Sequence, residues 1–397
     1  MADATIGGTS DALVVDAPVG VADAPTAVVD ATVGGADASA NADAMISPDA
    51  AAGTPDASGT PDAAGTPDAS IADASFPDAS VADAAPPVDA PPGTTCTLQT
   101  PSFSQLTAVA IPDSTTVTST ISVTGADPYL WGVTVQTNIT HSYSGDLEIV
   151  LISPTGTRIT MARRVAGTAD DVFNGTVWDD AAPTPVVDYS FSTGVTATPV
   201  VPEGAFAALA GEDANGVWTL EVTDAAGSDT GSIASWSLTL TAGVTPTPAS
   251  GTHNSTGAVA IPDDSSTTSS IVVAGAGSVI CDVNLTTNIT HTYSGDLDIA
   301  LVSPGGTRTV LVTENNAGTA ADVFNGSLWD DATGTLMADV SFSDGVTASP
   351  LLAEGAMGAF TGENPNGSWT LEVADTASID TGSIDAWSLI ITTCDCP

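Results

Sequence analysis

Asn138-Ile-Thr-His-Ser-Tyr-Ser-Gly-Asp-Leu147 is a stretch of sequence that occurs twice in this chain, the second time with Thr292 in place of Ser142. Its second copy begins at Asn288, 150 positions later. In both copies the stretch leads into an alternating segment and then into a Ser-Pro-x-Gly-Thr-Arg turn, at 153–158 and 303–308. Self-similarity over such a distance is too long for one unit of a solenoid, so it predicts a duplicated domain.

Apolar and polar residues alternate in the segments that surround this stretch. The alternation covers residues 133–139 and 147–151, and it returns in 218–222 and 236–240, each of which begins with a Trp. A period of two is typical of strands with one buried face. The Ser-Pro-x-Gly turn suits a hairpin, and no segment shows a helical period with caps. We therefore predict an all-β protein of two tandem jelly-roll β-sandwich domains.

Composition divides the chain into four parts. Residues 1–95 contain mainly Asp, Ala, Pro and Gly, and such a segment cannot bury enough apolar surface to offset its ordering entropy. We predict a disordered spacer there. Residues 96–243 and 258–397 form the two predicted jelly rolls, and the Pro-containing residues 244–257 form the predicted linker.

The charge of the chain is strongly one-sided. It has 48 Asp and Glu against four Arg and no Lys, for a net charge of -44. Nucleic-acid binding needs a basic face, so a nucleic-acid partner is excluded, and an anionic membrane surface is disfavoured. The charge favours divalent cations or simply solubility. No run of about 18 apolar residues occurs, so no transmembrane segment is expected.

A series of motifs follows in the same order in both repeats. The motifs are Ile-Pro-Asp, Ile-Thr-His-x-Tyr-x-Gly-Asp-Leu, Leu-x-Ser-Pro-x-Gly-Thr, Trp-Asp-Asp, Asn-Gly-x-Trp-x-Leu-x-Val, Asp-Thr-Gly-x-Ile and Trp-Ser-Leu. This series resembles the P domain, or homo B domain, that follows the catalytic domain of subtilisin-like proprotein convertases and of many secreted bacterial proteases. The resemblance covers about residues 100–242 and 251–393, and it implies a jelly roll beside a peptidase.

The resemblance has two departures. Convertases carry Arg-Gly-Asp where this chain has Ser144-Gly145-Asp146 and Ser294-Gly295-Asp296, so recognition through that Arg is not implied. The catalytic domain has no counterpart in the sequence, because the three His residues stand without a folded Ser-His-Asp triad. We therefore predict that the protein is not an enzyme, and that any serine-endopeptidase label would be inherited from the family.

Two histidines are candidates for acid/base chemistry. His141 and His291 each stand five residues before an Asp, and a His-Asp pair can be half of an acid/base device. No nucleophile or second base stands beside either pair. We favour the alternative that each imidazole forms hydrogen bonds within its loop.

Asp-rich loops offer hard oxygen ligands suited to Ca²⁺. The candidate ligands are Asp146, Asp171, Asp179, Asp180 and Asp224 in the first repeat, and Asp296, Asp322, Asp330, Asp331 and Asp375 in the second. No EF-hand loop is present, but the resemblance implies calcium, since some P domains bind it. The alternative is that these carboxylates cap local backbone amides in turns. The sequence leaves both open.

The tryptophans raise a further hypothesis, that exposed indole rings stack against sugars. Trp218 and Trp236, like Trp369 and Trp387, stand in alternating strands, which favours core packing. The remaining residues Trp131, Trp178 and Trp329 are less constrained, and we leave their exposure open.

Four cysteines, Cys96, Cys281, Cys394 and Cys396, lie near the ends of the domains. An even number suits two disulfides in an oxidising compartment. Cys394 and Cys396 are too close to bridge comfortably, so we expect one to pair with Cys281 and the other with Cys96. Disulfides favour an extracellular or cell-surface protein. No signal peptide follows Met1, so export would require a start codon upstream.

From these observations we expect an exported, non-catalytic protein whose two P-domain-like modules bind or stabilise a partner and are themselves stabilised by calcium. One alternative is an accessory of a subtilisin-like protease. A weaker alternative is a carbohydrate-binding jelly roll. The partner is an unknown protein or glycan, and the sequence does not name it.

Overall fold

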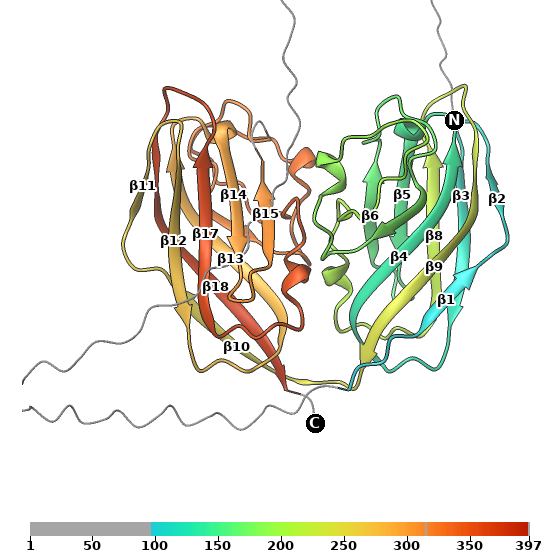
Figure 1. Cartoon of the computed structure of the whole chain (residues 1–397), viewed down its shortest axis with the longest axis horizontal. Helices are drawn as coiled ribbons and strands as arrows, with labels where there is room; N and C mark the ends of the chain where they lie inside the picture. Colours follow the sequence, from blue (N-terminus) through green and yellow to red (C-terminus); the bar gives the residue numbers. More distant parts are fainter. Residues whose placement is uncertain (1–96, 314–315, 396–397) are drawn as a thin grey trace, which may run out of the picture. The chain divides into compact units, whose positions relative to one another are not determined.

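The computed structural model describes residues 97–313 and 316–395. The chain divides into two units, Met1–Ala82 and Asp83–Pro397, and all described residues belong to the second. The predicted spacer lies outside the described residues. The second unit contains two β-sandwiches in tandem (Figure 1), so the prediction of an all-β fold with two sandwich domains is confirmed.

The first sandwich has a five-stranded and a four-stranded antiparallel sheet. Its elements are β1 (Ser102–Gln105), β2 (Val109–Ile111), β3 (Thr116–Val123), β4 (Tyr129–His141), η1 (Ser144–Asp146), β5 (Leu147–Ile152), β6 (Arg158–Arg163), β7 (Asn174–Trp178), η2 (Val186–Asp188), η3 (Phe206–Leu209), β8 (Gly216–Asp224) and β9 (Gly231–Gly243), where η marks a 3-10 helix. The larger sheet has the order β1-β9-β4-β7, with β2 also on β9, and the smaller has the order β3-β8-β5-β6.

The second sandwich repeats this topology. Its elements are β10 (Thr247–Asn254), β11 (Val259–Ile261), β12 (Ser266–Val273), β13 (Ile280–His291), η4 (Ser294–Asp296), β14 (Leu297–Val302), β15 (Arg308–Val312), β16 (Asn325–Trp329), η5 (Met337–Asp339), η6 (Met357–Phe360), β17 (Gly367–Asp375) and β18 (Gly382–Asp395). The sheet orders are β10-β18-β13-β16, with β11 on β18, and β12-β17-β14-β15.

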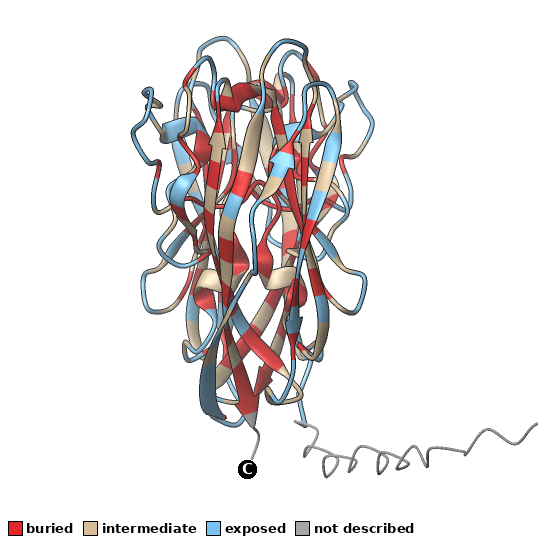
Figure 2. Ribbon diagram, turned by 90° about the vertical axis from the view of Figure 1, so that its left-hand side faces the viewer, coloured by how far each residue is buried: buried red, intermediate tan, exposed pale blue. Residues whose placement is uncertain are grey.

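The strands follow the alternation of the sequence, because every second side chain faces the space between the two sheets. Buried and exposed residues alternate along them in Figure 2. Each sandwich has its own core of aliphatic and aromatic side chains. All seven Trp residues are buried, including Trp131, Trp178 and Trp329, whose exposure the sequence left open. The indole nitrogen of Trp178, for example, donates to the hydroxyl of Thr137 at 2.9 Å.

The predicted linker, residues 244–257, contains a strand. β10 pairs along its whole length with β18, and the hydroxyls of Ser250 and Thr392 lie 2.9 Å apart across this pair. The sequence suggested a linker because Pro interrupts the alternation. Pro248 fits here because β10 is the edge of its sheet, where a missing amide proton leaves no neighbouring strand unpaired.

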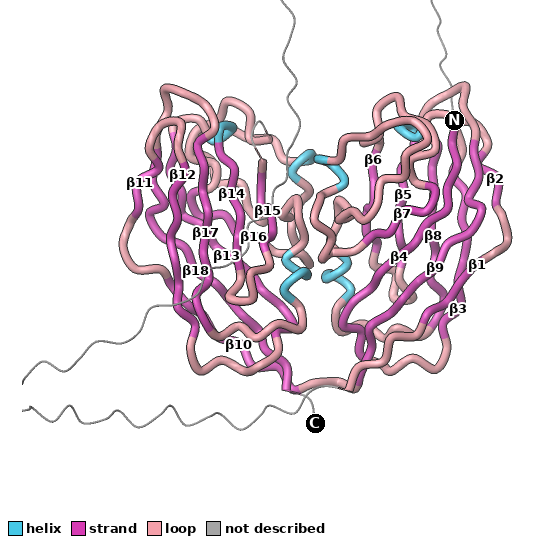
Figure 3. Tube along the Cα trace, viewed as in Figure 1, coloured by secondary structure: helices cyan, strands magenta, loops and turns pink. Residues whose placement is uncertain are grey.

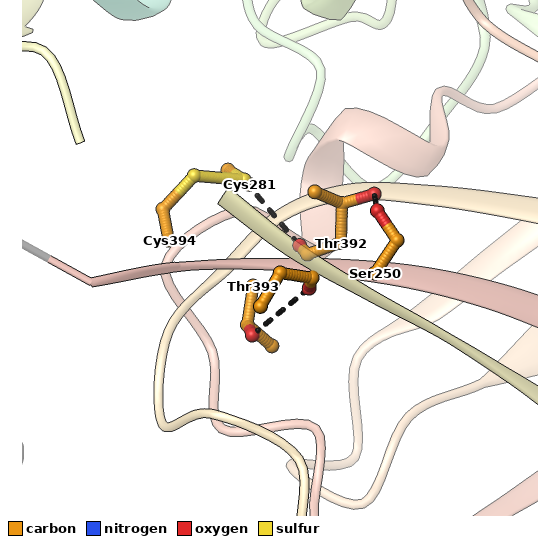
Figure 4. The surroundings of a disulfide bond; sticks show 6 residues. Ser250, Cys281, Thr392, Thr393 and Cys394 are labelled. Carbon is orange, nitrogen blue, oxygen red and sulfur yellow. Dashed lines mark hydrogen bonds between the residues drawn. A yellow bond between two sulfur atoms is a disulfide. The ribbon is translucent and has the colours of Figure 1, made fainter. Parts of the chain in front are cut away.

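A disulfide joins the beginning of β13 to the end of β18. Cys281 and Cys394 are bonded (Figure 4), which is one of the two pairings for Cys281 that the sequence left open. Cys96 and Cys396 lie outside the described residues. In the first sandwich the equivalent positions hold Trp131 and Gly243. Trp131 packs against the disulfide in one small apolar cluster, so the two repeats touch through different side chains at equivalent places.

A second contact joins the two sandwiches through the 3-10 helices η3 and η6, which face each other (Figure 3). Val201 and Ala205 of the first sandwich pack against Leu352 and Ala356 of the second. These pairs occupy equivalent positions in the two repeats, so the contact is close to symmetric.

Candidate functional site

A buried imidazole and carboxylate lie together at one end of the first sandwich. His141 ends β4, Asp224 ends β8, and the distance from His141 Nε2 to Asp224 Oδ2 is 3.4 Å. The other ring nitrogen, Nδ1, lies 2.8 Å from the carbonyl oxygen of Tyr143. A ring protonated on both nitrogens can donate to both oxygens. Both side chains are 0% exposed.

The second sandwich has the same arrangement. His291 Nε2 lies 3.2 Å from Asp375 Oδ2, and its Nδ1 lies 2.8 Å from the carbonyl oxygen of Tyr293. These side chains are also 0% exposed. The repeated Ile-Thr-His-x-Tyr motif therefore places the imidazole where a strand end, a turn and a neighbouring strand meet.

Asp171, in the loop before β7, lies beside His141. Its Oδ1 accepts the backbone N–H of His141 at 2.9 Å, and its own amide donates to the carbonyl of His141 at 3.1 Å. The backbone of Asp171 has φ of 56°, a left-handed conformation that Asp tolerates better than most residues. Asp322 repeats both features, with 2.9 Å to the amide of His291 and φ of 58°.

Asp146 completes the group at this end of the first sandwich. It lies in η1, is 8% exposed, and its carbonyl accepts the amide of Ala225, the residue after Asp224. Three of the five candidate calcium ligands, Asp146, Asp171 and Asp224, thus lie around His141. In the second sandwich Asp296, Asp322 and Asp375 occupy the equivalent positions.

Burial limits the acid/base chemistry that the two His–Asp pairs can perform. A general acid or base must reach its substrate within hydrogen-bonding distance, and neither His141 nor His291 has an exposed side chain. In the second sandwich Nε2 of His291 and Oδ2 of Asp375 form a hydrogen bond at 3.2 Å, so each has a partner. In the first sandwich Nε2 of His141 and Oδ2 of Asp224 lie 3.4 Å apart and are buried without a hydrogen-bond partner. We conclude that in this conformation the pairs hold the loops together.

The remaining two candidates of each repeat lie elsewhere, on the loops between the two sandwiches. Asp179 caps a turn, since its Oδ1 accepts the amide of Ala181 at 2.9 Å. Asp180 accepts the amides of Phe206 and Ala207 at 2.9 and 2.8 Å, at the start of η3. Burial raises the pKa of Asp180 to about 7. The local cap of the sequence hypothesis is therefore present at Asp179, whereas Asp180 accepts amides 26 and 27 positions away in the sequence.

The second repeat uses the same residues. Asp330 accepts the amide of Ala332 at 2.7 Å, and Asp331 accepts the amide of Gly358 at 2.8 Å, in η6. Burial first, and then the charge of Asp180, raise the pKa of Asp331 to about 8. Among the described residues, no group of three or more His, Cys, Asp or Glu side chains is arranged to hold a metal ion.

Two buried glutamates escaped the sequence analysis. Glu203 and Glu354 are 8% and 7% exposed, and they occupy equivalent positions in the two repeats. Burial, as the largest cause, raises the pKa of each to about 7. The signal that could have revealed them is the repeated Glu-Gly-Ala, which follows an apolar pair in both copies.

Comparison with known proteins supports the family that the motifs suggested. The family model of the proprotein convertase P-domain matches residues 130–240 and 280–391, one segment in each sandwich. Among the described residues, no helix is long and apolar enough to cross a membrane.

Three curated relatives are similar to this chain. The transglutaminase-activating metalloprotease of Streptomyces mobaraensis is 35% identical over 172 residues, which are 43% of this chain and 18% of that protein. Leupeptin-inactivating enzyme 1 of Streptomyces exfoliatus is 33% identical over 142 residues, 35% of this chain and 26% of that enzyme. The calcium-dependent protease of Nostoc sp. is 33% identical over 107 residues, 26% of this chain and 13% of that protease.

These relatives correct one prediction. We predicted that the protein is not an enzyme, and this is contradicted, because two relatives are named proteases and the third is named an enzyme. The prediction rested on the catalytic residues missing from 397 positions. The chain spans only 13 to 26% of the length of these relatives. The lack of a catalytic triad in the 397 residues therefore does not decide whether the protein is an enzyme.

The match covers both repeats and more than half of the chain, and the two matched segments have the same sheet topology. The ordered motifs of the sequence lie in strands and turns at equivalent places of the two sandwiches. This chain belongs to the proprotein convertase P-domain family.

Proposed function

We propose that the two P domains are a binding and stabilising module of a protease, in a protein that acts outside the cell. The observation that carries the proposal is that the P-domain sequence occurs here in tandem and the similar proteins are named proteases. The disulfide between Cys281 and Cys394 supports the location, because such bonds persist in oxidising compartments.

The carbohydrate alternative gains no support from the tryptophans. Sugar stacking needs exposed aromatic faces, and all seven Trp residues are buried. The most exposed of the three discussed as less constrained, Trp131, is 4% exposed and packs against the disulfide. We therefore prefer a protein partner.

The function is tested on the native protein. Antibodies raised against residues 97–395 would isolate it from the source organism under mild conditions, and mass spectrometry would identify every polypeptide present. We expect a peptidase domain, either in the same polypeptide or in stoichiometric association. Native material that contains the P domains and no peptidase in either form would contradict the proposal.

Calcium is the second part of the proposal. The Nostoc relative is named calcium-dependent, and three carboxylates gather at one end of each sandwich. These carboxylates alone do not form a metal site, so a bound Ca²⁺ would also draw on backbone carbonyls and water. With Kd of about 10⁻⁴ to 10⁻³ M, as is typical of extracellular modules, 1 mM Ca²⁺ would stabilise each sandwich by about 0.4 to 1.4 kcal/mol.

The calcium prediction is measured as a rise of a few degrees in Tm. Equal ionic strength of NaCl, and then Mg²⁺, controls for screening of the net charge. Asp171→Asn keeps the oxygen that bonds His141 and tolerates a positive φ, so it removes charge with little change in fold. The first sandwich should lose its calcium response, while Asp179→Asn should leave it intact. If NaCl matches Ca²⁺, the loops are ordinary acidic turns.

A further inference from the structure

Acidic residues surround the contact between the two sandwiches in equivalent pairs. The pairs are Glu203 and Glu354, Asp188 and Asp339, and Glu148 and Asp298. We name the two groups by their buried glutamate: the Glu203 group (Glu203, Glu148, Asp339) and the Glu354 group (Glu354, Asp298, Asp188). Each group includes one Asp from the opposite sandwich.

The Glu203 group holds a guanidinium. The amide of Arg163 donates to Oε1 of Glu203. The side chain of Arg163 then crosses to the second sandwich, where Nη1 lies 2.9 and 3.1 Å from the two carboxylate oxygens of Asp339. The positive charge of Arg163 opposes the rise in the pKa of Glu203, which burial and the neighbouring acids Asp339 and Glu148 cause.

The Glu354 group has no arginine at the equivalent position, where the chain has Thr313. Oε2 of Glu354 accepts the amide of Thr313 at 3.0 Å, as Glu203 accepts that of Arg163. Its Oε1 accepts a hydrogen bond from the side-chain amide of Asn316. These neutral donors bring no charge, and the charges of Asp188 and Asp298 add to the effect of burial in raising the pKa of Glu354.

A small cavity of about 70 Å³ lies beside this group. Its lining residues include the apolar Leu336, Met337 and Leu352, together with the two acidic residues Glu203 and Glu354. A guanidinium is planar and weakly hydrated, lies well against apolar walls, and binds a carboxylate through two parallel hydrogen bonds. The cavity and its charge match such a group.

We propose that the Glu354 group binds the guanidinium of an arginine side chain supplied by another protein, at the position equivalent to that of Arg163 in the Glu203 group. The Glu354 group thus contains Asp188, whose counterpart Asp339 binds a guanidinium within the chain. A metal ion is a poorer occupant, because among the described residues no three His, Cys, Asp or Glu side chains are arranged to hold one metal ion. This inference does not depend on the association with a protease.

The binding test uses the full chain and a single arginine. Nα-acetyl-arginine methylamide is added while NMR follows the amide of Thr313 and the side-chain amide of Asn316. We expect saturation at about 1 to 10 mM, the range for a small ligand with few contacts. The citrulline derivative, which has the same shape without charge, should give no saturable shift. The lysine derivative should bind at least about threefold more weakly, because an ammonium cannot form the paired hydrogen bonds.

Variants at the equivalent positions make the test reciprocal. Thr313→Arg should supply the guanidinium from within, raise Tm and remove the binding of added arginine. Arg163→Thr should open the Glu203 group and create a second binding site. Asp188→Asn, which changes an exposed side chain of the opposite sandwich, should weaken binding at least about threefold, the loss of part of a charge-assisted contact.

Three results would overturn the proposal. Shifts that never saturate show screening of the acidic surface rather than a site. Equal binding of the lysine derivative excludes a guanidinium site. Unchanged binding in Asp188→Asn, a variant that keeps the fold whatever happens to Thr313→Arg, excludes the Glu354 group as the location.

Discussion

Replacing Asp375 by alanine is expected to lower the free energy of unfolding of the second sandwich by about 3 to 5 kcal/mol. Asp375 and His291 are both 0% exposed and 3.2 Å apart. Removal of the carboxylate leaves Nε2 of the imidazole in a site that water does not reach, with no acceptor for a proton on it. The loss is large because the remaining polar group keeps its desolvation penalty without its partner.

Hydrogen exchange of the amides of β14 and β17 in increasing urea would measure this loss in the sandwich concerned. Asp385→Ala, at an exposed position of the same sandwich, is the matched control and should change stability by no more than about 0.5 kcal/mol. The double variant His291→Ala with Asp375→Ala should cost less than the sum of the single variants. Additive losses would show that the two side chains do not interact.

Much of the fold could be predicted from the sequence, because it depends on local patterns. The duplicated stretch at 138–147 gave the number of domains, and alternation gave the strands on either side of it. The inward faces of Trp218 and Trp236 followed from the same period of two. β10 was missed because edge pairing tolerates a proline and needs no strong alternation, so its signal lies in the partner strand β18 rather than in residues 247–254.

The candidate site was harder to predict, because its members come together only through the topology. Asp171 and Asp179 are eight positions apart in sequence. β7 carries the chain from one end of the sandwich to the other between them, so Asp171 meets His141 while Asp179 faces the other repeat. Nor does spacing show burial, and burial is what raises the pKa of Glu203. The repeated Glu-Gly-Ala can be seen in the sequence. Only the structure shows that its glutamates, Glu203 and Glu354, are buried beside the contact between the two sandwiches.

Gly145→Ala is expected to destabilise the first sandwich by about 3 kcal/mol or more. A Cβ at Gly145 would lie 1.8 Å from the carbonyl oxygen of Gly167, where the loop after β6 crosses the turn. The neighbouring amide of Ser144 donates to the carbonyl of Ala169 at 2.8 Å, so the loop cannot retreat without losing that bond. The close approach of the Gly167 carbonyl therefore requires glycine at position 145 of the Ser-Gly-Asp motif.

Gly132→Ala in β4 is the matched control, since its Cβ would meet no atom closer than 3.9 Å. An alanine there also restricts the unfolded chain, so the change should be neutral or stabilising by up to about 1 kcal/mol. Urea unfolding followed by hydrogen exchange of β5 and β8 compares the two variants. The second repeat provides an independent check, because a Cβ at Gly295 would lie 2.1 Å from the carbonyl oxygen of Gly318. If Gly145→Ala and Gly132→Ala are equally stable, the turn is free to move, and the motif owes its repetition to something other than this close approach.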